Sequence, residues 1–312
     1  METRPTSGTA SKRVTVISVC FNSSQILPEM LASLPDDVRV VIVDNGSEDI
    51  QRVRSLCART SIRLIENGKN LGFGRACNIG ARGVETEFLL FLNPDAKLQA
   101  GAIQALLKGA DIHPEACAFN PIDLCNGRKR LLKRSSVLLP RRNWEVEGGS
   151  ARDRRLPVLS GAALFVRRSA FEAVGGFDEQ IFLYHEDDDI SLRLKHQCGA
   201  LLCLSDAIVS HARGQSSLRN AQTARQKAMY MGQSRVYATR KHGVPYAYAK
   251  ASASGLLRVL SPINVLSARK RSENLGFLNG VWSARKPRAP VRQASPGNRA
   301  LGGKIPNRFG WM

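Results

Sequence analysis

The amino-acid sequence predicts an α/β fold built around a mostly parallel β-sheet. The first hundred residues alternate between short apolar runs and helix-like segments, and the apolar runs are continuous and rich in β-branched side chains. Continuous runs are typical of strands buried on both faces, and strands that alternate with helices pair in parallel. We therefore expect a Rossmann-like sheet covered on both faces, with a ligand site beyond the carboxyl ends of its strands.

The predicted elements follow one another in a regular order. Ser23 or Ser24 can cap the first helix, and Asn70 opens a glycine-containing turn that leads into a later one. A helix beginning at Asp187 is expected because acids gather at its start and bases near its end. Strands are predicted at 14–20, 38–43, 62–65, 88–92, 158–166, 201–204 and 207–210, and helices at 26–34, 50–58, 76–80, 169–174 and from 187 onward.

Composition divides the chain into four segments. A length of 312 residues with 43% hydrophobic content suits one large domain with an appendage. We expect a flexible N-terminus at 1–12, the main α/β domain at 13–219, a helical extension at 220–266 and a basic, disordered tail at 267–312. Within the main domain, the basic and turn-rich stretch 128–155 is predicted to be a mobile loop.

The cysteines and the hydropathy pattern indicate where in the cell the protein is located. The seven cysteines are odd in number and scattered, and they form no Cys-x-x-Cys pair, which favours a reducing compartment over disulfides or structural zinc. The first eleven residues carry no apolar signal core, and no run approaches the roughly 18 apolar residues of a membrane span. We expect a cytoplasmic protein that is free or peripheral at the inner face of the membrane.

The net charge of +20 is concentrated in particular segments. After Ser267 the chain carries ten Arg or Lys residues against Glu273 alone, and the stretch 128–155 is also basic. Nucleic acid, anionic lipid and a phosphorylated substrate are the partners that such charge favours. Aromatic side chains are too sparse among the basic runs for nucleic-acid binding, so we expect no nucleic acid and favour an anionic membrane surface for the tail.

Two short acidic segments follow apolar runs in the sequence. Asn93-Pro94-Asp95 comes directly after the predicted strand 88–92, and Glu186-Asp187-Asp188-Asp189 places four acids in a row. Adjacent carboxylates repel and need a cation, a proton or a cationic partner. One acidic turn for a metal ion and another for proton abstraction would suit group transfer from an anionic activated donor.

The chain resembles the family 2 inverting glycosyltransferases of the GT-A fold, and within them the rhamnosyltransferase-like branch. The ordered set of matching segments spans residues 14–217, about two-thirds of the sequence. The segments are VTVISVCFNS, VVIVDNGSED, NLGFGRACNIGA, FLLFLNPDA, LSGAALFVRRSAFEAVGGFDE, FLYHEDDDISLRLKHQCG and HARGQSS.

The resemblance implies a nucleotide-sugar site at the sheet edge. Asp44 would hydrogen-bond the nucleotide base, although an Asx turn after a strand is the structural alternative. Asp95 and His211 would bind Mg²⁺ or Mn²⁺, and Asn93, which replaces the first aspartate of an Asp-x-Asp motif, would contact ribose or a metal-bound water. The other implied donor-binding residues are Asn22, Asn70, Gly72 and Arg75, with Arg75 stacking on the base or meeting phosphate.

The second acidic segment, Glu186-Asp187-Asp188-Asp189, matches the family's Glu-Asp-x-Asp signature. The resemblance makes Asp187 the catalytic base, and its acidic neighbours are expected to raise its pKa toward neutrality. Glu186, Asp188 and Gly161 would complete the acceptor side of the site, while Asp189 would cap the helix or orient Arg193. Transfer would proceed with inversion and without a covalent intermediate.

Several alternatives remain open at this stage. The branch favours dTDP-L-rhamnose as the donor and a cell-surface glycan or polyprenyl-linked sugar as the acceptor, with UDP-hexoses and UDP-galactofuranose as other donors. A glycoside hydrolase also needs two carboxylates, but it needs no nucleotide site. A nucleotidyltransferase would be expected to carry a Gly-rich phosphate loop after the first strand, where this chain has Cys20-Phe21-Asn22-Ser23.

Overall fold

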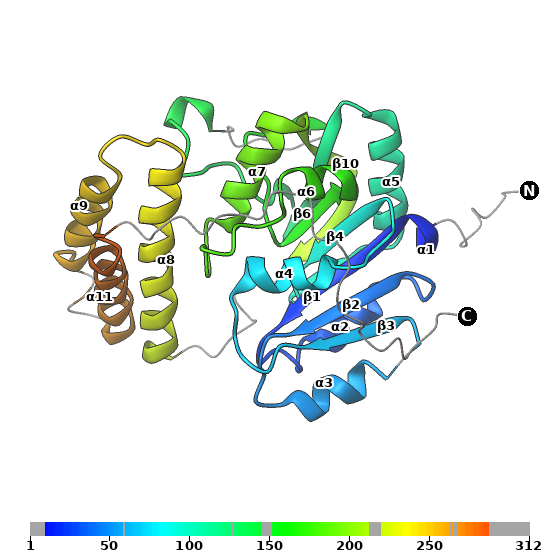
Figure 1. Ribbon diagram of the computed structural model, residues 1–312, viewed down its shortest axis with the longest axis horizontal. Coiled ribbons are helices and arrows are strands. Elements are labelled where there is room, and N and C mark those ends of the chain that lie inside the picture. The colour runs from blue at the N-terminus through cyan, green and yellow to red at the C-terminus, as the bar shows by residue number, and fades with distance from the viewer. Residues whose placement is uncertain are drawn as a thin grey trace, which may run out of the picture.

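A computed structural model describes residues 10–58, 60–125, 128–144, 152–211, 220–262, 264 and 267–286. The described strands form one ten-stranded sheet with the path β3-β2-β1-β4-β9-β6-β10-β5, while β7 pairs with β6 and β8 with β10. Figure 1 shows this sheet between helices, with the C-terminal helices stacked at one end of the molecule. The α/β class predicted from the sequence is confirmed.

The first four strands of that path are parallel, as the sequence predicts. They are β3 (Ile62–Glu66), β2 (Arg39–Asp44), β1 (Val14–Cys20) and β4 (Phe88–Leu92). In the β1–β2 pairing Cys20 lies opposite Asp44, so the carboxyl ends of these strands meet at one edge. The polar turns that follow β2 and β4 therefore lie at the same end of the sheet.

The second half of the sheet is mixed. Strand β9 (Ala163–Arg167) is antiparallel to both β4 and β6 (Ala116–Cys125), while β10 (Ala200–His211) is parallel to β6. The short strand β5 (Ala96–Leu98) pairs antiparallel with the end of β10. The predicted strand at 158–166 thus begins only at Ala163, and the two strands predicted at 201–204 and 207–210 are one irregular strand.

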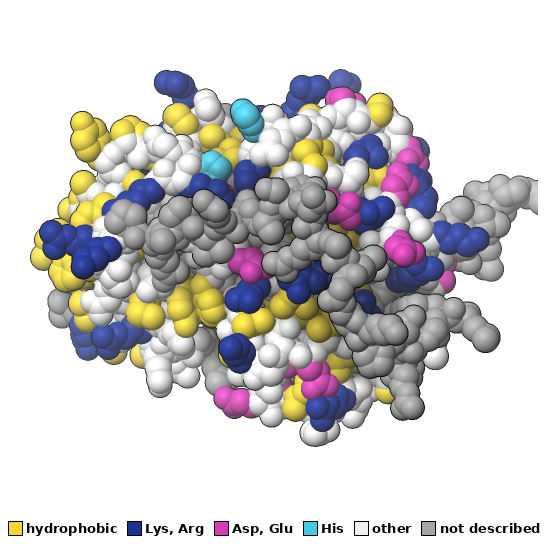
Figure 2. All heavy atoms as spheres, viewed as in Figure 1, with side chains coloured by type: hydrophobic (Ala, Val, Ile, Leu, Met, Phe, Trp, Pro, Cys, Tyr) yellow, Lys and Arg dark blue, Asp and Glu magenta, His cyan; other side chains and the backbone are white. Residues whose placement is uncertain are grey.

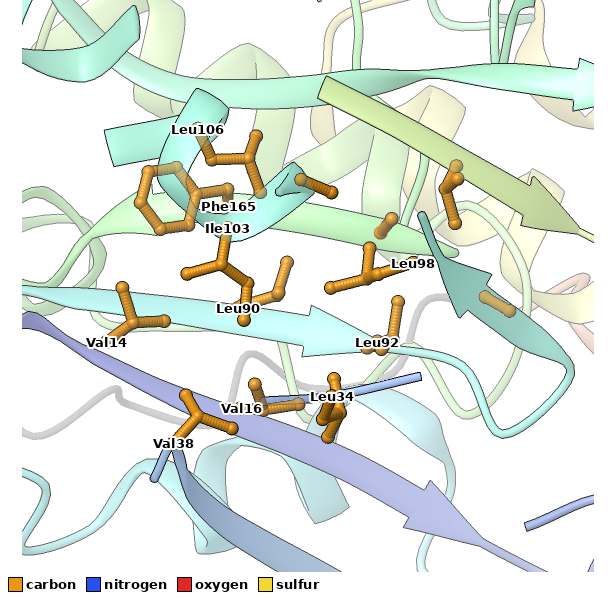
Figure 3. Packing of buried hydrophobic residues seen from close by; sticks show 14 of the residues in the cluster. Val14, Val16, Leu34, Val38, Leu90, Leu92, Leu98, Ile103, Leu106 and Phe165 are labelled. Atoms are coloured by element: carbon orange, nitrogen blue, oxygen red, sulfur yellow. The ribbon is translucent and has the colours of Figure 1, made fainter. Parts of the chain in front are cut away.

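Alternating side chains of the strands build a core on each face. Val14, Val16, Leu90 and Leu92 pack on one face with helix α5 (Ala102–Ile112), as Figure 3 shows for Ile103 and Leu106. The same face is covered by α2 (Leu27–Ala32) and α3 (Ile50–Leu56). The opposite face is covered by α4 (Phe73–Ala81), α6 (Arg168–Ala173) and α7 (Glu186–Gln197). Burial on both faces explains the continuous apolar runs.

Two sequence predictions within the main domain are wrong. The stretch 128–155 contains β7 (Arg128–Leu131), the 3-10 turn η2 (Arg141–Asn143) and β8 (Arg154–Arg155), and residues 145–151 lie outside the described residues. Ser23 and Ser24 do not cap α2, because its N-cap is Ile26 and the Ser23 hydroxyl donates to the Phe21 carbonyl at 2.9 Å. At the N-terminus, Ala10–Arg13 form the short helix α1, and residues 1–9 lie outside the described part.

The helical extension is longer than predicted. Helices α8 (Ala221–Lys241) and α9 (Ala247–Val259) occupy the expected segment, but α11 (Ala268–Ser283) forms in what the sequence predicts to be a disordered tail. Gly276 and Gly280 explain the packing of α11, because a Cβ at either would collide with α8 backbone atoms of Arg225 or Met229. The tail prediction is therefore wrong for 268–283, and 287–312 lie outside the described residues. None of the described helices is long and apolar enough to cross a membrane.

Candidate active site

A cavity of about 560 Å³ opens at the carboxyl edge of β1, β2 and β4. Its walls come from segments far apart in sequence, including the start of α7 and one face of α8. The lining includes Val19, Phe21, Asn45, Asn70, Gly72, Asn93, Gly161, Tyr184, Glu186, Asp187, His211, Lys227 and Tyr230. The sheet edge predicted to hold the site thus carries a cavity of nucleotide-sugar dimensions.

Asp44 closes the turn after β2 and is buried at 2% exposure. Its Oδ2 accepts hydrogen bonds from the backbone N–H groups of Gly46 at 3.0 Å and Ser47 at 3.1 Å, which is the Asx turn considered above. Its Oδ1 is buried and has no hydrogen-bond partner among the described residues. One oxygen therefore shapes the turn and the other remains able to accept an N–H from a bound base.

Asn45 organises the loop on the other side of the cavity, a role that the sequence does not predict. Its Nδ2 donates to Asn70 Oδ1 at 3.0 Å and to the Gly72 carbonyl, while its Oδ1 accepts from the Leu71 N–H at 3.1 Å. Gly72 has φ of +87°, and a Cβ there would collide with the Phe182 carbonyl. The only sequence signal for Asn45 is its place directly after Asp44 in a turn.

Four predicted donor-site residues are not among those that line the cavity: Asn22, Asp44, Arg75 and Asp95. Asn22 adopts φ of +52° and its Oδ1 accepts from the Glu48 N–H at 2.9 Å, so it supports the turn that Asp44 closes. Arg75 is half-exposed on α4 and pairs with Glu179 at 3.4 Å. Both side chains lie beside the predicted donor site, with protein partners of their own.

Asp95 and His211 converge across the sheet edge. The pairing of β5 with β10 sets His211 opposite Ala96, and this register brings His211 Nε2 to 3.2 Å from Asp95 Oδ1. Both side chains are largely buried, with 14% of His211 and 3% of Asp95 exposed. Lys227 from α8 lines the same cavity; burial lowers its pKa, and the charge of Asp95 opposes that shift. Lys227 was not predicted, because nothing local in sequence links α8 to this edge.

Asp187 stands in the first turn of α7, where two non-glycine residues with positive φ precede the helix. Tyr184 and His185 have φ of +69° and +67°, a conformation that costs about 1–2 kcal/mol per residue. The Gly161 N–H donates to Asp187 Oδ2 at 3.2 Å, and a Cβ on Gly161 would lie 3.3 Å from the Asp187 Cβ. This strained start aims the carboxylate into the cavity at a point where only a glycine fits comfortably opposite it.

Lys133 is the cation that the acidic run requires. Its ammonium lies 2.7 Å from Asp187 Oδ2 and 2.8 Å from Asp188 Oδ1, with 21% of its side chain exposed. Burial works against the charge of Lys133, yet Asp187 and Asp188 raise its pKa above the ordinary lysine value. A lysine 54 positions earlier in the chain thus lies between two of the four carboxylates, a partner that the sequence analysis does not predict.

The other acids have separate partners. Burial would raise the pKa of Asp188, but the hydrogen bond from His185 and the charge of Lys133 lower it to about 2. Asp189 is held by Arg193, as predicted, and also by Lys241 and His242 of the helical extension, at 2.7–2.8 Å. These partners hold the pKa of Asp189 well below its usual range despite burial. The N-cap of α7 is His185 and not Asp189, and the His185 side chain makes no capping hydrogen bond.

Glu186 has a different electrostatic character. It is 8% exposed, and its Oε2 has no hydrogen-bond partner among the described residues. Burial, followed by the negative charge of Asp187, raises the pKa of Glu186 to about 8. At neutral pH Glu186 therefore favours its protonated form, whereas Asp187, which lines the same two cavities, is paired with Lys133.

A second cavity of about 300 Å³ lies on the other side of the acidic turn. It shares Tyr184, Glu186 and Asp187 with the first cavity. Its remaining walls are Lys133, Ser135, Ser136, Val137, Trp144, His185, Asp188 and Met231. A further cavity of about 340 Å³ between α8 and the end of α11 contains none of these acids. Asp187 thus stands between two hollows, one at the sheet edge and one against the segment 133–144.

A Rossmann-like sheet that ends in paired acidic turns defines a class of nucleotide-sugar transferases, and sequence comparison agrees. The family model described as "Glycosyl transferase family 2" matches residues 15–175. The chain therefore belongs to glycosyl transferase family 2 and is a glycosyltransferase.

Individual relatives give more detail. The chain is 29% identical over 295 residues to the N-acetylglucosaminyl-diphospho-decaprenol L-rhamnosyltransferase of Mycobacterium tuberculosis H37Rv, covering 82% of this chain and 94% of that protein. It is 23% identical to the low-salt glycan biosynthesis hexosyltransferase Agl10 of Haloferax volcanii, covering 65% of this chain and 70% of that one.

Solved structures share the fold. A mannosyltransferase from Pyrobaculum calidifontis, solved with GDP-Man and Mn²⁺, superposes with a TM-score of 0.52 at 17% identity, over 87% of this chain and 86% of that one. S. aureus TarS 1-349 with UDP-GlcNAc gives 0.50 at 17% identity, over 88% and 91%. The predicted GT-A architecture with C-terminal helices is confirmed.

Proposed function

We propose that this glycosyltransferase moves L-rhamnose from dTDP-L-rhamnose to a sugar carried on a polyprenyl diphosphate, with inversion at the anomeric carbon. The observation that carries the proposal is the position of Asp187 in the wall shared by two cavities. The rhamnosyl donor and the lipid-linked acceptor rest on the 29% identical relative, whose name specifies both. UDP-hexoses and UDP-galactofuranose are the alternative donors.

The donor would occupy the cavity at the sheet edge. Asp44 Oδ1, which is buried without a hydrogen-bond partner among the described residues, would accept the ring N–H of thymine or uracil, and the loop held by Asn45 would line the nucleoside. Lys227, which lines the cavity and feels the charge of Asp95, would meet the diphosphate charge. Asn22 would act through the turn after β2 and Arg75 from the rim, since both side chains have protein partners.

In this proposal a divalent ion would lie beside Asp95. Asp95 and His211 converge, buried, at the edge of the donor cavity, although no cluster of three or more His, Cys, Asp or Glu side chains occurs there or elsewhere among the described residues. Two protein ligands suit a metal whose other ligands are diphosphate oxygens and water, as is common for Mg²⁺. Bound Mg²⁺ or Mn²⁺ would neutralise charge on the leaving diphosphate. Asn93, which lines the same cavity, would contact ribose or a water.

Proton transfer belongs to Asp187. An acceptor sugar in the second cavity would present its hydroxyl to this carboxylate, with Trp144 and the serines of 135–136 around the ring. Gly161 and Lys133 hold Asp187 in place, and the neutral Glu186 adds no second negative charge beside it. As the hydroxyl attacks from the face opposite the leaving group, Asp187 removes its proton, and the configuration inverts in one displacement.

A polyprenyl-linked acceptor would place the reaction at the inner face of the membrane. The basic C-terminal segment supports a peripheral location there, because anionic headgroups attract Lys and Arg near the surface. Residues 287–312 of this segment lie outside the described residues.

A donor panel tests the proposal. Purified enzyme would be incubated with Mn²⁺, a short-chain N-acetylglucosaminyl-diphospho-polyprenol and dTDP-rhamnose, UDP-glucose, UDP-galactose or UDP-galactofuranose, and products would be resolved by mass spectrometry. We expect a rhamnosyl product of the opposite anomeric configuration to the donor. Preferential turnover of a UDP-sugar would replace the donor assignment. Sugar release without any nucleotide sugar would indicate a hydrolase instead.

A further inference from the structure

Helix α9 has its large and small side chains on unexpected faces. The side buried against the protein carries Ala247, Ala251 and Gly255, whereas Leu256 and Leu257 on the outer side are 45% and 71% exposed. A helix that packs on a globular core normally turns its large apolar residues inward. Helix α9 instead buries the small ones and presents leucine to the surroundings.

The close approach of α11 explains the buried face. A Cβ on Gly255 would lie 2.8 Å from Leu278 Cδ1, so α9 seats tightly against α11 and leaves no room for a larger residue. Nothing in that contact requires leucines on the opposite side. Of the nine large hydrophobic side chains that are exposed among the described residues, six lie in the C-terminal helices and their connections: Tyr246, Leu256, Leu257, Leu260, Leu275 and Trp282.

The same surface is basic. Lys250 lies two helical turns before Leu257, and the two line a shallow hollow together with Ala253. At the start of α11, Arg269, Lys270 and Arg271 are exposed. Residues 241–286 contain eight Lys or Arg and a single acid, Glu273, which Lys270 already pairs at 3.0 Å. Figure 2 shows hydrophobic and basic side chains side by side at the end of the molecule where Figure 1 places α9 and α11.

We propose that the outer face of α9, defined by Tyr246, Lys250, Leu256, Leu257 and Leu260, docks on an anionic lipid bilayer. Leucine and tyrosine would enter the boundary between headgroups and acyl chains, and the surrounding lysines and arginines would pair with anionic headgroups. The basic charge of this face argues against a second copy of the chain as its binding partner. Two such faces would bring like charges together with almost no acid to oppose them.

The proposal goes beyond the transfer reaction, because it assigns a docking surface that does not depend on which sugar is moved. It also implies that only the helices of the C-terminal extension separate the bilayer from the donor cavity. Helix α8 carries Lys227 and Tyr230 into the donor cavity, and both α9 and α11 pack on α8. The docking face lies within the described helices, so it does not need the segment beyond residue 286.

Vesicle sedimentation of the full chain tests the proposal. The variants are the double substitution Leu257→Ser/Leu260→Ser, the charge variant Lys250→Gln/Arg269→Gln, and the control Ile112→Ser, which removes a 60% exposed apolar side chain from α5. Vesicles of phosphatidylcholine alone would be compared with vesicles containing a third phosphatidylglycerol. Neither donor nor acceptor is present, so the result is independent of the glycosyl transfer reaction.

We expect wild type and Ile112→Ser to bind the anionic vesicles equally. The leucine double variant should lose at least tenfold in partitioning, since two exposed leucines lose their burial in the interface. The charge variant should bind more weakly and show less dependence on salt. Equal binding by the leucine variant and wild type would overturn the proposal. So would equal binding to neutral vesicles, or a wild-type dimer that the leucine variant dissociates while no vesicle binding is seen.

Discussion

The buried Glu186 predicts how stability depends on pH. Its pKa is raised from 4.5 to about 8, so between these values the folded protein holds a proton that the unfolded chain releases. The folded state then binds more protons than the unfolded state, and the free energy of unfolding must fall as pH rises. The contribution of this group is fully present below pH 4.5 and is lost as pH rises through about 8.

The magnitude follows from the size of the shift. At about 1.4 kcal/mol per pKa unit, a change from 4.5 to about 8 sets a ceiling of roughly 5 kcal/mol. Because part of the shift comes from the neighbouring charge of Asp187, we expect roughly 2–4 kcal/mol to appear in the measurement. Glu186→Gln removes the titration while keeping the side-chain shape, so its stability should change less over the same pH range.

Urea unfolding between pH 5 and pH 9 is the assay. The difference in unfolding free energy, Glu186→Gln minus wild type, should increase by roughly 2–4 kcal/mol across that range. Glu85→Gln, at an exposed glutamate, is the control and should follow wild type. Parallel curves for Glu186→Gln and wild type would refute the reasoning, because they would mean that Glu186 is ionised in the folded protein near neutral pH.

Three other changes probe the site. Lys133→Met leaves Asp187 and Asp188 without their shared cation and should lower the unfolding free energy by about 2–4 kcal/mol in urea at pH 7, whereas Lys108→Met at an exposed position should not. Asn45→Ala releases the loop at 70–72 and should raise KM for the donor about tenfold with a smaller change in kcat, which steady-state kinetics would measure. If Asp95 binds the metal, Asp95→Ala should gain no dTDP affinity from Mn²⁺, so that calorimetry finds the variant with Mn²⁺ binding dTDP only as tightly as wild type in EDTA. A variant that binds dTDP with Mn²⁺ as tightly as wild type with Mn²⁺ would contradict metal binding by Asp95.

Local patterns predict the first half of the sheet well. Strands β1 and β4 begin and end where continuous β-branched or aromatic runs do, because burial on both faces removes polar residues from the whole strand. The acidic turns are equally visible, since each directly follows or precedes an element that local sequence defines. The position of Asp95 after the carboxyl end of β4 is therefore predictable from local sequence, whereas the assignment of Asp187 to the site depends on the resemblance to the family.

Local patterns do not predict side chains that contact the site from segments far away in the sequence. Lys133 reaches Asp187 from a basic stretch that resembles a loop, and Lys227 reaches the donor cavity from a helix with no sequence link to the sheet. Helix α11 was missed for another reason. Its glycines and basic residues are typical of disorder, yet Gly276 and Gly280 lie where α8 and α11 approach most closely, so a composition that weakens an isolated helix makes this pair possible.

The most direct measurement for the central claim compares Asp187→Asn with Asp206→Asn, an exposed aspartate on β10, in single-turnover transfer from dTDP-rhamnose. A general base contributes about 10²–10⁴-fold, so Asp187→Asn should lose that much of the transfer rate while thermal unfolding and dTDP affinity stay close to wild type. Asp206→Asn should transfer normally. If Asp187→Asn transfers within a few-fold of wild type, or if Asp188→Asn suffers the larger loss, Asp187 is not the base.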